Sequence, residues 1–212
     1  MSLPAIDRRP TLLEGVIVLV IGFRGMYFLW KYLPWAQPVG YAWVMHLWMA
    51  LVPLAWCVLF RRQIPFAFGN IRAAALPAIA TLAISVAGLF TLYFMVGRAQ
   101  LAEVFPGDPA SLFFEAIAPG LGEEVLFRGF FQTSLSRALP GFAVPIAAII
   151  FGVAHLTNGF PLPLLLTVGF FSTLIGLGLG LMYQRTGNLL ATIVAHNALN
   201  LINCGIVLVL PG

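Results

Sequence analysis

Long runs of apolar residues, separated by short stretches rich in proline, glycine and charge, make up nearly the whole chain. Each run has about 20 residues, the length of an α-helix that crosses a bilayer. The regular alternation that marks the strands of a membrane barrel is absent. The pattern predicts an all-α fold, a polytopic transmembrane helical bundle with about seven spans. The predicted spans are residues 12–30, 41–60, 73–97, 111–135, 140–156, 161–183 and 189–210.

Composition supports the same fold class. Of the 212 residues, 61% are hydrophobic and only 8% are charged, whereas soluble domains have about 25% charged residues. Mean hydropathy is +0.99. The spans leave no room for a separate soluble domain. We divide the chain into residues 1–110, three N-terminal helices without a motif, and residues 111–212, which carry the candidate chemistry.

Basic residues favour alternate loops and so predict an orientation. With a cytoplasmic N-terminus, seven arginines fall in inner loops, and only Lys31 and Arg98 fall in outer ones. We therefore expect an integral protein of the cell (inner) membrane, with membrane lipids as partners. The net charge of +4 is scattered without a patch, so no nucleic-acid partner is expected. The inner-loop arginines are Arg8, Arg9, Arg61, Arg62, Arg72, Arg137 and Arg185.

The fourth predicted span, residues 111–135, carries charged groups in an apolar run. A charged side chain at mid-bilayer costs roughly 2.5–3.5 kcal/mol, so such groups usually face the bundle interior and indicate function. Glu124 and Arg128 are four residues apart and can pair on one helix face. Glu123 lies about 100° round the helix and needs another partner. Pro119 and Gly120 predict a break one turn earlier, beside a polar cavity.

Two later spans add polar groups that could meet this pair. His155 ends the fifth span, and His196 and Asn200 lie four apart on one face of the seventh. The predicted boundaries place the two histidines at different depths, so these spans must be offset or tilted, or the boundaries must differ. A carboxylate in a low-dielectric site can act as general base on water. A histidine and an asparagine can donate hydrogen bonds to a developing oxyanion. Hydrolysis of a peptide bond in or near the membrane is the simplest chemistry for this set.

Other polar residues are interpreted as structural. His46 is read as a satisfied or interfacial histidine, and Glu14 is expected to pair with Arg24 or to reach the membrane surface. The glycines of the sixth span let neighbouring helices approach closely.

The motifs together resemble a known family. Glu-Glu-x-x-x-Arg (Glu123 to Arg128), Phe-x-x-x-His (Phe151 to His155) and His-x-x-x-Asn (His196 to Asn200) follow one another on successive late spans. This order resembles the CPBP (CAAX protease and bacteriocin-processing, Abi) family of glutamate-type intramembrane proteases, which includes the type 2 CAAX prenyl endopeptidases. The resemblance covers about residues 111–210 and implies that residues 111–212 form a protease core of this kind.

The resemblance also implies roles for these residues. Glu123 would activate the water with help from His155, while His196 and Asn200 would form the oxyanion hole. Glu124, Arg128 and Phe151 would support the site. It implies an intramembrane glutamic endopeptidase without a metal or other cofactor, acting near the terminus of a membrane-anchored or lipidated peptide or protein.

Alternatives stay open on the sequence alone. The glutamates and histidines could bind zinc in a membrane metallopeptidase, although a His-Glu-x-x-His pair is missing. The cluster could instead serve as a polar helix clamp in a non-catalytic immunity or scaffold protein. A proton-coupled transporter is a third possibility, for which internal repeats would be expected.

Overall fold

The computed structural model describes residues 8–32, 38–63, 71–105, 107–157 and 161–211, and these residues form helices without a β-strand. Every predicted span coincides with a helix or a series of helices, so the all-α prediction is confirmed. The elements are α1 (Leu12–Tyr32), α2 (Pro38–Leu59), η1 (Ile71–Ala74), α3 (Ala75–Val104), α4 (Pro109–Glu115), α5 (Ala118–Glu124), η2 (Val125–Gln132), α6 (Thr133–Ala138), α7 (Ala143–Ala154), η3 (His155–Thr157), α8 (Leu162–Thr186) and α9 (Leu189–Val209).

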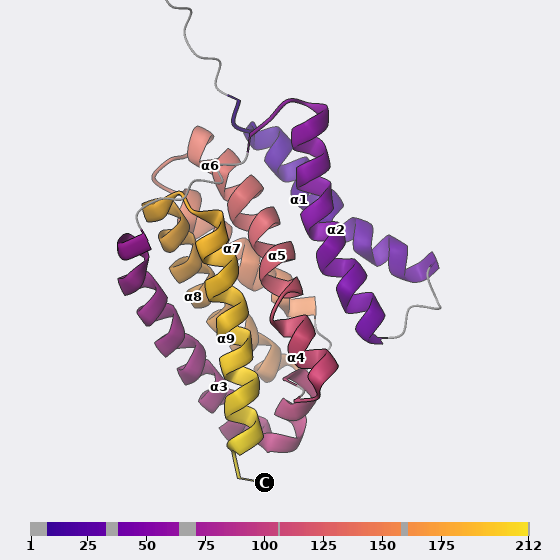
Figure 1. The fold of residues 1–212 in the computed structure, drawn as a ribbon, viewed down its shortest axis with the longest axis vertical. Helices are drawn as coiled ribbons and strands as arrows, with labels where there is room; N and C mark the ends of the chain where they lie inside the picture. The colour runs from indigo at the N-terminus through magenta and orange to yellow at the C-terminus, as the bar shows by residue number, and fades with distance from the viewer. Residues whose placement is uncertain (1–7, 33–37, 64–70, 106, 158–160, 212) are drawn as a thin grey trace, which may run out of the picture.

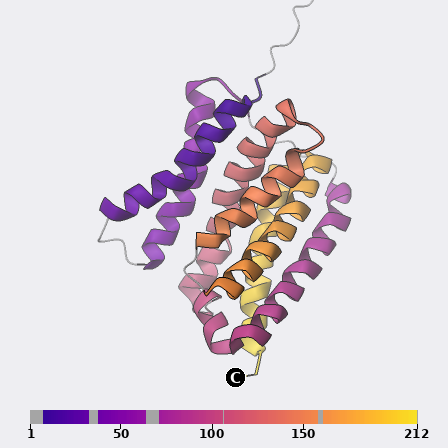
Figure 2. The same ribbon diagram turned by 180° about the vertical axis from the view of Figure 1, so that it is seen from behind.

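The helices form a bundle with the α5–η2–α6 segment near its centre. Helices α3, α8 and α9 run side by side, and α1 and α2 form a pair on the other flank (Figure 1 and Figure 2). Helix α8 packs against both α3 and α7, while α5 lies between α2 and α9. The η2 segment contacts α1, α2, α7, α8 and α9. Side chains of this segment therefore meet residues from both ends of the chain.

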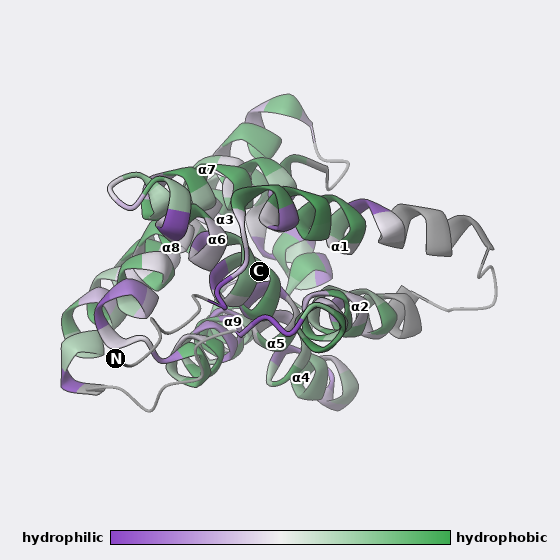
Figure 3. Ribbon diagram, turned by 90° about the horizontal axis from the view of Figure 1, so that it is seen from above, coloured by the Kyte–Doolittle hydropathy of each residue, from purple (hydrophilic) through white to green (hydrophobic). Residues whose placement is uncertain are grey.

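Four helices of the described residues are long and apolar enough to cross a membrane: Ala42–Leu59, Arg72–Val104, Leu162–Thr186 and Leu189–Val209. Figure 3 shows apolar residues over most of the ribbon. The outer surface carries large apolar side chains such as Val58, Phe94 and Val209, each about four-fifths exposed. Lipid tails would cover such a surface, whereas water would not. The chain is an integral membrane protein; the count of seven spans stays a prediction.

The predicted break in the fourth span is present. The backbone leaves helical geometry at Ile117 (φ −130°, ψ −54°), and α5 begins at the next residue with Pro119 in its first turn. Asn197 of α9 repairs the break from outside. Its Nδ2 donates to the Ile117 carbonyl (3.3 Å), and its Oδ1 accepts from the Gly120 N–H (2.7 Å). A side chain from another helix thus supplies a partner for the Gly120 N–H, while the Ile117 carbonyl also accepts from the Leu121 N–H (3.3 Å).

Directly after the acidic pair, the helix widens into a π-helix over Val125–Gln132. Sequence spacing alone does not predict this change, because π-helices are rare and have no strong residue preference. In this wider helix, the Arg128 carbonyl accepts a hydrogen bond from the Thr133 hydroxyl at 3.1 Å. The π-helix keeps the Arg128 and Gln132 side chains on the side of α8, where both find acceptors.

Helix α7 explains why His155 and His196, predicted at different depths, line the same cavity. It has 12 residues, or about 18 Å, which is shorter than the ~30 Å apolar core of a bilayer. The predicted fifth span, residues 140–156, is therefore longer than the α-helix in it. His155 follows the last turn of this short helix and stands at the level of the bundle interior rather than at its surface.

Several segments that carry the inner-loop arginines lie at one end of the bundle. The Arg8 carbonyl accepts from the Gln63 N–H (3.0 Å), and Arg137 donates to the Arg9 carbonyl (2.9 Å). Glu14 pairs with Arg62 (2.8 Å) and not with Arg24, which corrects the first of the two alternatives expected for Glu14. Residues 14 and 24 are ten apart and lie almost three turns apart on α1, whereas α2 returns Arg62 to the level of Glu14.

Candidate active site

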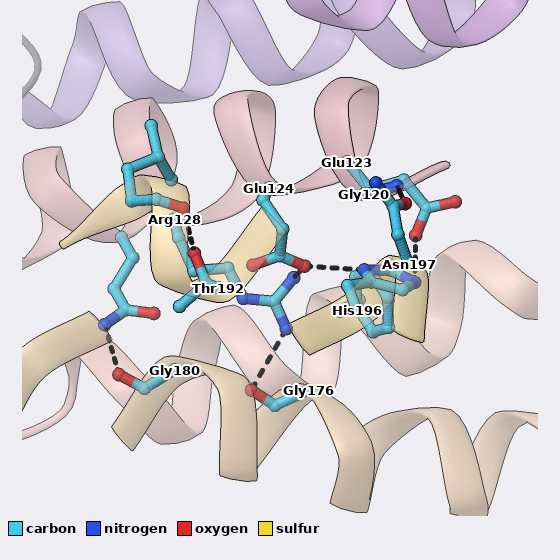
Figure 4. Close-up of polar contacts among 12 residues, drawn as sticks. Gly120, Glu123, Glu124, Arg128, Gly176, Gly180, Thr192, His196 and Asn197 are labelled. Carbon is cyan, nitrogen blue, oxygen red and sulfur yellow. Dashed lines mark hydrogen bonds and ion pairs between the residues drawn. The ribbon is translucent and has the colours of Figure 1, made fainter. Parts of the chain in front are cut away.

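Glu124 is the centre of a buried charge network. Its side chain is fully buried, and its Oε1 accepts from Arg128 Nη1 at 3.0 Å and from His196 Nδ1 at 2.8 Å. The pairing of Glu124 with Arg128, predicted from their spacing, is confirmed. In Figure 4 the three side chains point toward one another between the helices. The carboxylate therefore fixes the position of His196, which lies on α9.

Arg128 is held on three sides. Besides Glu124, its Nη2 donates to the Gly176 carbonyl (3.1 Å), and its guanidinium lies 4.4 Å from the centre of the Phe151 ring. A Cβ at Gly176 would stand 3.1 Å from that ring, so glycine permits the close approach of α8. One turn on, Gln132 donates to the Gly180 carbonyl (3.0 Å). The expected role of these glycines in close helix packing is confirmed.

Glu123 faces a different direction from Glu124 and lines a cavity. Its Oε1 lies 3.3 Å from His46 Nε2. Its Oε2 lies 3.9 Å from His196 Nε2, beyond hydrogen-bonding distance, and makes no hydrogen bond within the described residues. Glu123 thus has one oxygen anchored to a histidine and a second oxygen free to bind a water molecule.

Three histidines around the cavity share one hydrogen-bonding pattern. Nδ1 of His46 lies 2.8 Å from the Ala42 carbonyl, and Nδ1 of His155 lies 2.8 Å from the Phe151 carbonyl. Nδ1 of His196 faces the Glu124 carboxylate. A carbonyl or carboxylate oxygen accepts hydrogen bonds, so each Nδ1 carries the proton. Each Nε2 is left for the chemistry of the site, with a proton only when the ring is an imidazolium.

The cavity has a volume of about 720 Å³ and joins the predicted site residues. Glu123, Phe151, His155, His196 and Asn200 all line it. Its polar part continues to Glu115, which lines the cavity together with Asn200. Much of its remaining wall consists of apolar side chains of α3 and α8, which include Leu89, Leu92, Met95, Val168, Phe171 and Ile175. A polar centre beside an apolar channel suits a substrate that has both kinds of surface.

A comparison with protein families agrees with this geometry. Residues 105–202 match the family model described as "Type II CAAX prenyl endopeptidase Rce1-like". The chain carries an Rce1-like domain. This is a family of proteases, and therefore of hydrolases, in agreement with the resemblance found in the motifs. No curated protein and no solved structure matches the chain.

The Rce1-like domain contains every residue predicted for the site, and the fold brings them together. Glu123, His155, His196 and Asn200 share the cavity, while Glu124 and Arg128 lie behind it. Phe151 contacts residues of both groups, because its ring also lies over the Arg128 guanidinium. Its ring centre is 4.6 Å from that of His155 and 6.1 Å from that of His196.

The predicted site lacks His46 and Glu115, two ionisable residues that line the cavity. The sequence pattern favours a structural role for His46, yet it contacts Glu123 and lies outside the Rce1-like domain. Glu115 belongs to none of the three motifs, although it lines the same cavity. Each is an ionisable residue in a predicted span, and that is the signal that could have found them.

Among the described residues, no group of three or more His, Cys, Asp or Glu is arranged to hold a metal ion.

Proposed function

We propose that this chain is an intramembrane glutamic endopeptidase that hydrolyses a peptide bond near the terminus of a membrane-tethered or lipidated substrate. The observation that carries the proposal is the free Oε2 of Glu123, which lines the cavity beside His155, His196 and Asn200. The Rce1-like domain supports the reaction class. The apolar α3 and α8 walls supply room for a lipid or an apolar peptide segment next to the scissile bond.

Glu123 acts as the general base. Its Oε2 takes a proton from a water molecule as the water oxygen attacks the carbonyl carbon of the substrate. His155 has Nδ1–H on the Phe151 carbonyl, so its neutral ring presents Nε2 as an acceptor that orients the water. When the tetrahedral intermediate collapses, the C–N bond breaks and Glu123 returns the proton to the leaving amine. Two hydrogen atoms and one oxygen are added across the bond, and the base is regenerated.

His196 and Asn200 stabilise the oxyanion. Since Nδ1 of His196 donates to Glu124, its Nε2 can donate to an oxyanion only when the ring is an imidazolium. Glu124 is then its counter-ion at 2.8 Å. Arg128 compensates the same carboxylate. In this scheme Glu124 and Arg128 hold His196 in place and do not touch the substrate.

Cleavage of a peptide library by the purified protein tests the proposal. The library holds lipidated and unlipidated membrane-anchored peptides, and wild type is compared with Glu123→Gln in detergent. Loss of a general base lowers the rate by about 10²–10⁴-fold, while the isosteric amide should leave insertion and the overall fold intact, with at most a small loss of stability from the contact with His46. The cleaved members then define the lipid and the position of the scissile bond. Cleavage that persists in Glu123→Gln would refute the assignment of the base.

Two controls separate the competing functions. Asp108→Asn is the matched control, a change of carboxylate to amide outside the spans. Hydrogen bonds from the hydroxyl and backbone of Ser111 lower the pKa of Asp108, so its carboxylate is ionised like that of a general base. This variant should cleave like wild type. A chelator should leave activity intact; inhibition together with stoichiometric zinc would establish a metallopeptidase instead. If neither protein cleaves and Glu123→Gln unfolds at a markedly lower temperature, the cluster serves as a helix clamp.

A further inference from the structure

His46 of α2 is held in place from several directions. Its side chain is buried, with Nδ1 on the Ala42 carbonyl and the ring edge-to-face with Phe114 at 5.4 Å. A Cβ at Gly122 would stand 2.8 Å from the His46 Cα, so only glycine before Glu123 lets α2 come this close to α5. The close approach brings Nε2 to 3.3 Å from Glu123 Oε1.

The hydrogen bonds of His46 determine where a proton must be. Because Nδ1–H donates to a carbonyl, a neutral ring would turn a lone pair toward Glu123. Two acceptors do not attract each other, so one proton lies between Nε2 and Oε1. A general base must be ionised before it can accept a proton from water. When Glu123 is ionised, the shared proton is therefore on His46, and the contact is an ion pair.

We infer that His46 is a positioning residue for Glu123. The ion pair anchors Oε1 and leaves Oε2, on the side of His196, to face the cavity. Glu115 of α4 is a further ionisable group near His46, and it lines the same cavity. The inference rests on the proposed peptidase function and extends it. The catalytic base depends on an N-terminal helix that the Rce1-like domain, residues 105–202, does not include.

Three variants of α2 test this role. His46→Phe keeps a ring of similar shape against Phe114 and Gly122 but has no nitrogen. His46→Gln keeps a donor that can reach Oε1. Met49→Ala removes a buried side chain of α2 that does not line the cavity, and so reports lost packing alone. The kcat and KM of each variant are measured on a peptide that wild type cleaves.

We expect His46→Phe to lower kcat by about 10–100-fold, the range found for residues that orient metal ligands, with KM within about 2-fold of wild type. His46→Gln should recover most of that loss. Met49→Ala should unfold at a lower temperature and keep its kcat. A kcat of His46→Phe within about 2-fold of wild type, or an equal loss in Met49→Ala, would overturn the inference.

A second measurement does not need a substrate. Thermal unfolding of His46→Phe, Glu123→Gln and the double variant should show coupling, because each single change removes the same contact. Additive effects would overturn the inference even if no peptide were cleaved. Failure of wild type to cleave, together with coupling, would refute the peptidase function and leave the His46–Glu123 contact established.

Discussion

Replacing Arg128 by methionine removes one partner of a buried charge pair and leaves the other in place. Arg128 is 1% exposed and Glu124 is 0% exposed, and their N–O distance is 3.0 Å. The change also removes the hydrogen bond to the Gly176 carbonyl and the contact of the guanidinium with Phe151. Methionine fills a similar volume, so the loss reports charge and hydrogen bonding more than packing.

The expected cost follows from the charge left behind. Removing one partner of a buried ion pair typically costs about 3–5 kcal/mol, because the remaining charge is buried without compensation. His196 still donates to Glu124 at 2.8 Å, which favours the lower end of that range. A loss of about 3 kcal/mol is a large part of the ~5–15 kcal/mol by which a typical protein is stable. Replacing Glu124 by leucine as well removes both charges, so the double variant should lose less than Arg128→Met alone.

Equilibrium unfolding in mixed micelles, followed by the fluorescence of the five tryptophans, measures these free energies. Arg137→Met is the matched control. Arg137 is exposed on α6 and donates to the Arg9 carbonyl, and its loss should cost less than about 1 kcal/mol. The reasoning fails if Arg128→Met costs no more than this control. It also fails if the double variant loses as much as the sum of the two single ones.

Two further predictions concern the packing that holds the site together. Asn197→Ala leaves the buried Gly120 N–H without its partner, and should lower the free energy of unfolding by about 1–3 kcal/mol, measured in the same micelles; an unchanged unfolding curve would show that the break in the fourth span needs no repair. Gly176→Leu places a side chain against the Phe151 ring and should cost about 1–3 kcal/mol through overpacking, with a smaller cost for Gly176→Ala. Equal stability of the leucine variant and wild type would contradict the close approach of α8.

Features that depend on residues close in the sequence could be predicted. Chain composition and run length fixed the helical membrane class because a bilayer accepts few other structures. Proline predicted the break before α5, because a proline inside a helix removes a backbone hydrogen bond and its ring clashes with the preceding turn. The four-residue spacing predicted the Glu124–Arg128 pair, since helix geometry alone brings those side chains together. The three motifs also indicated which late residues to group around a cavity.

Contacts between distant residues were decided by the tertiary structure. The positions of His46 and Glu14 in the sequence could not reveal their partners. His46 contacts Glu123 and Glu14 pairs with Arg62, and both contacts depend on how α2 and the residues that follow it pack against their neighbours. Asn197 could not be recognised as the repair of a broken helix without the place of α9 beside α5. Helical periodicity gives the face on which a side chain lies, but it carries no information on which helix covers that face. The sequence therefore determined the membrane class and the residues that could do chemistry, and the packing of the helices decided which of them meet.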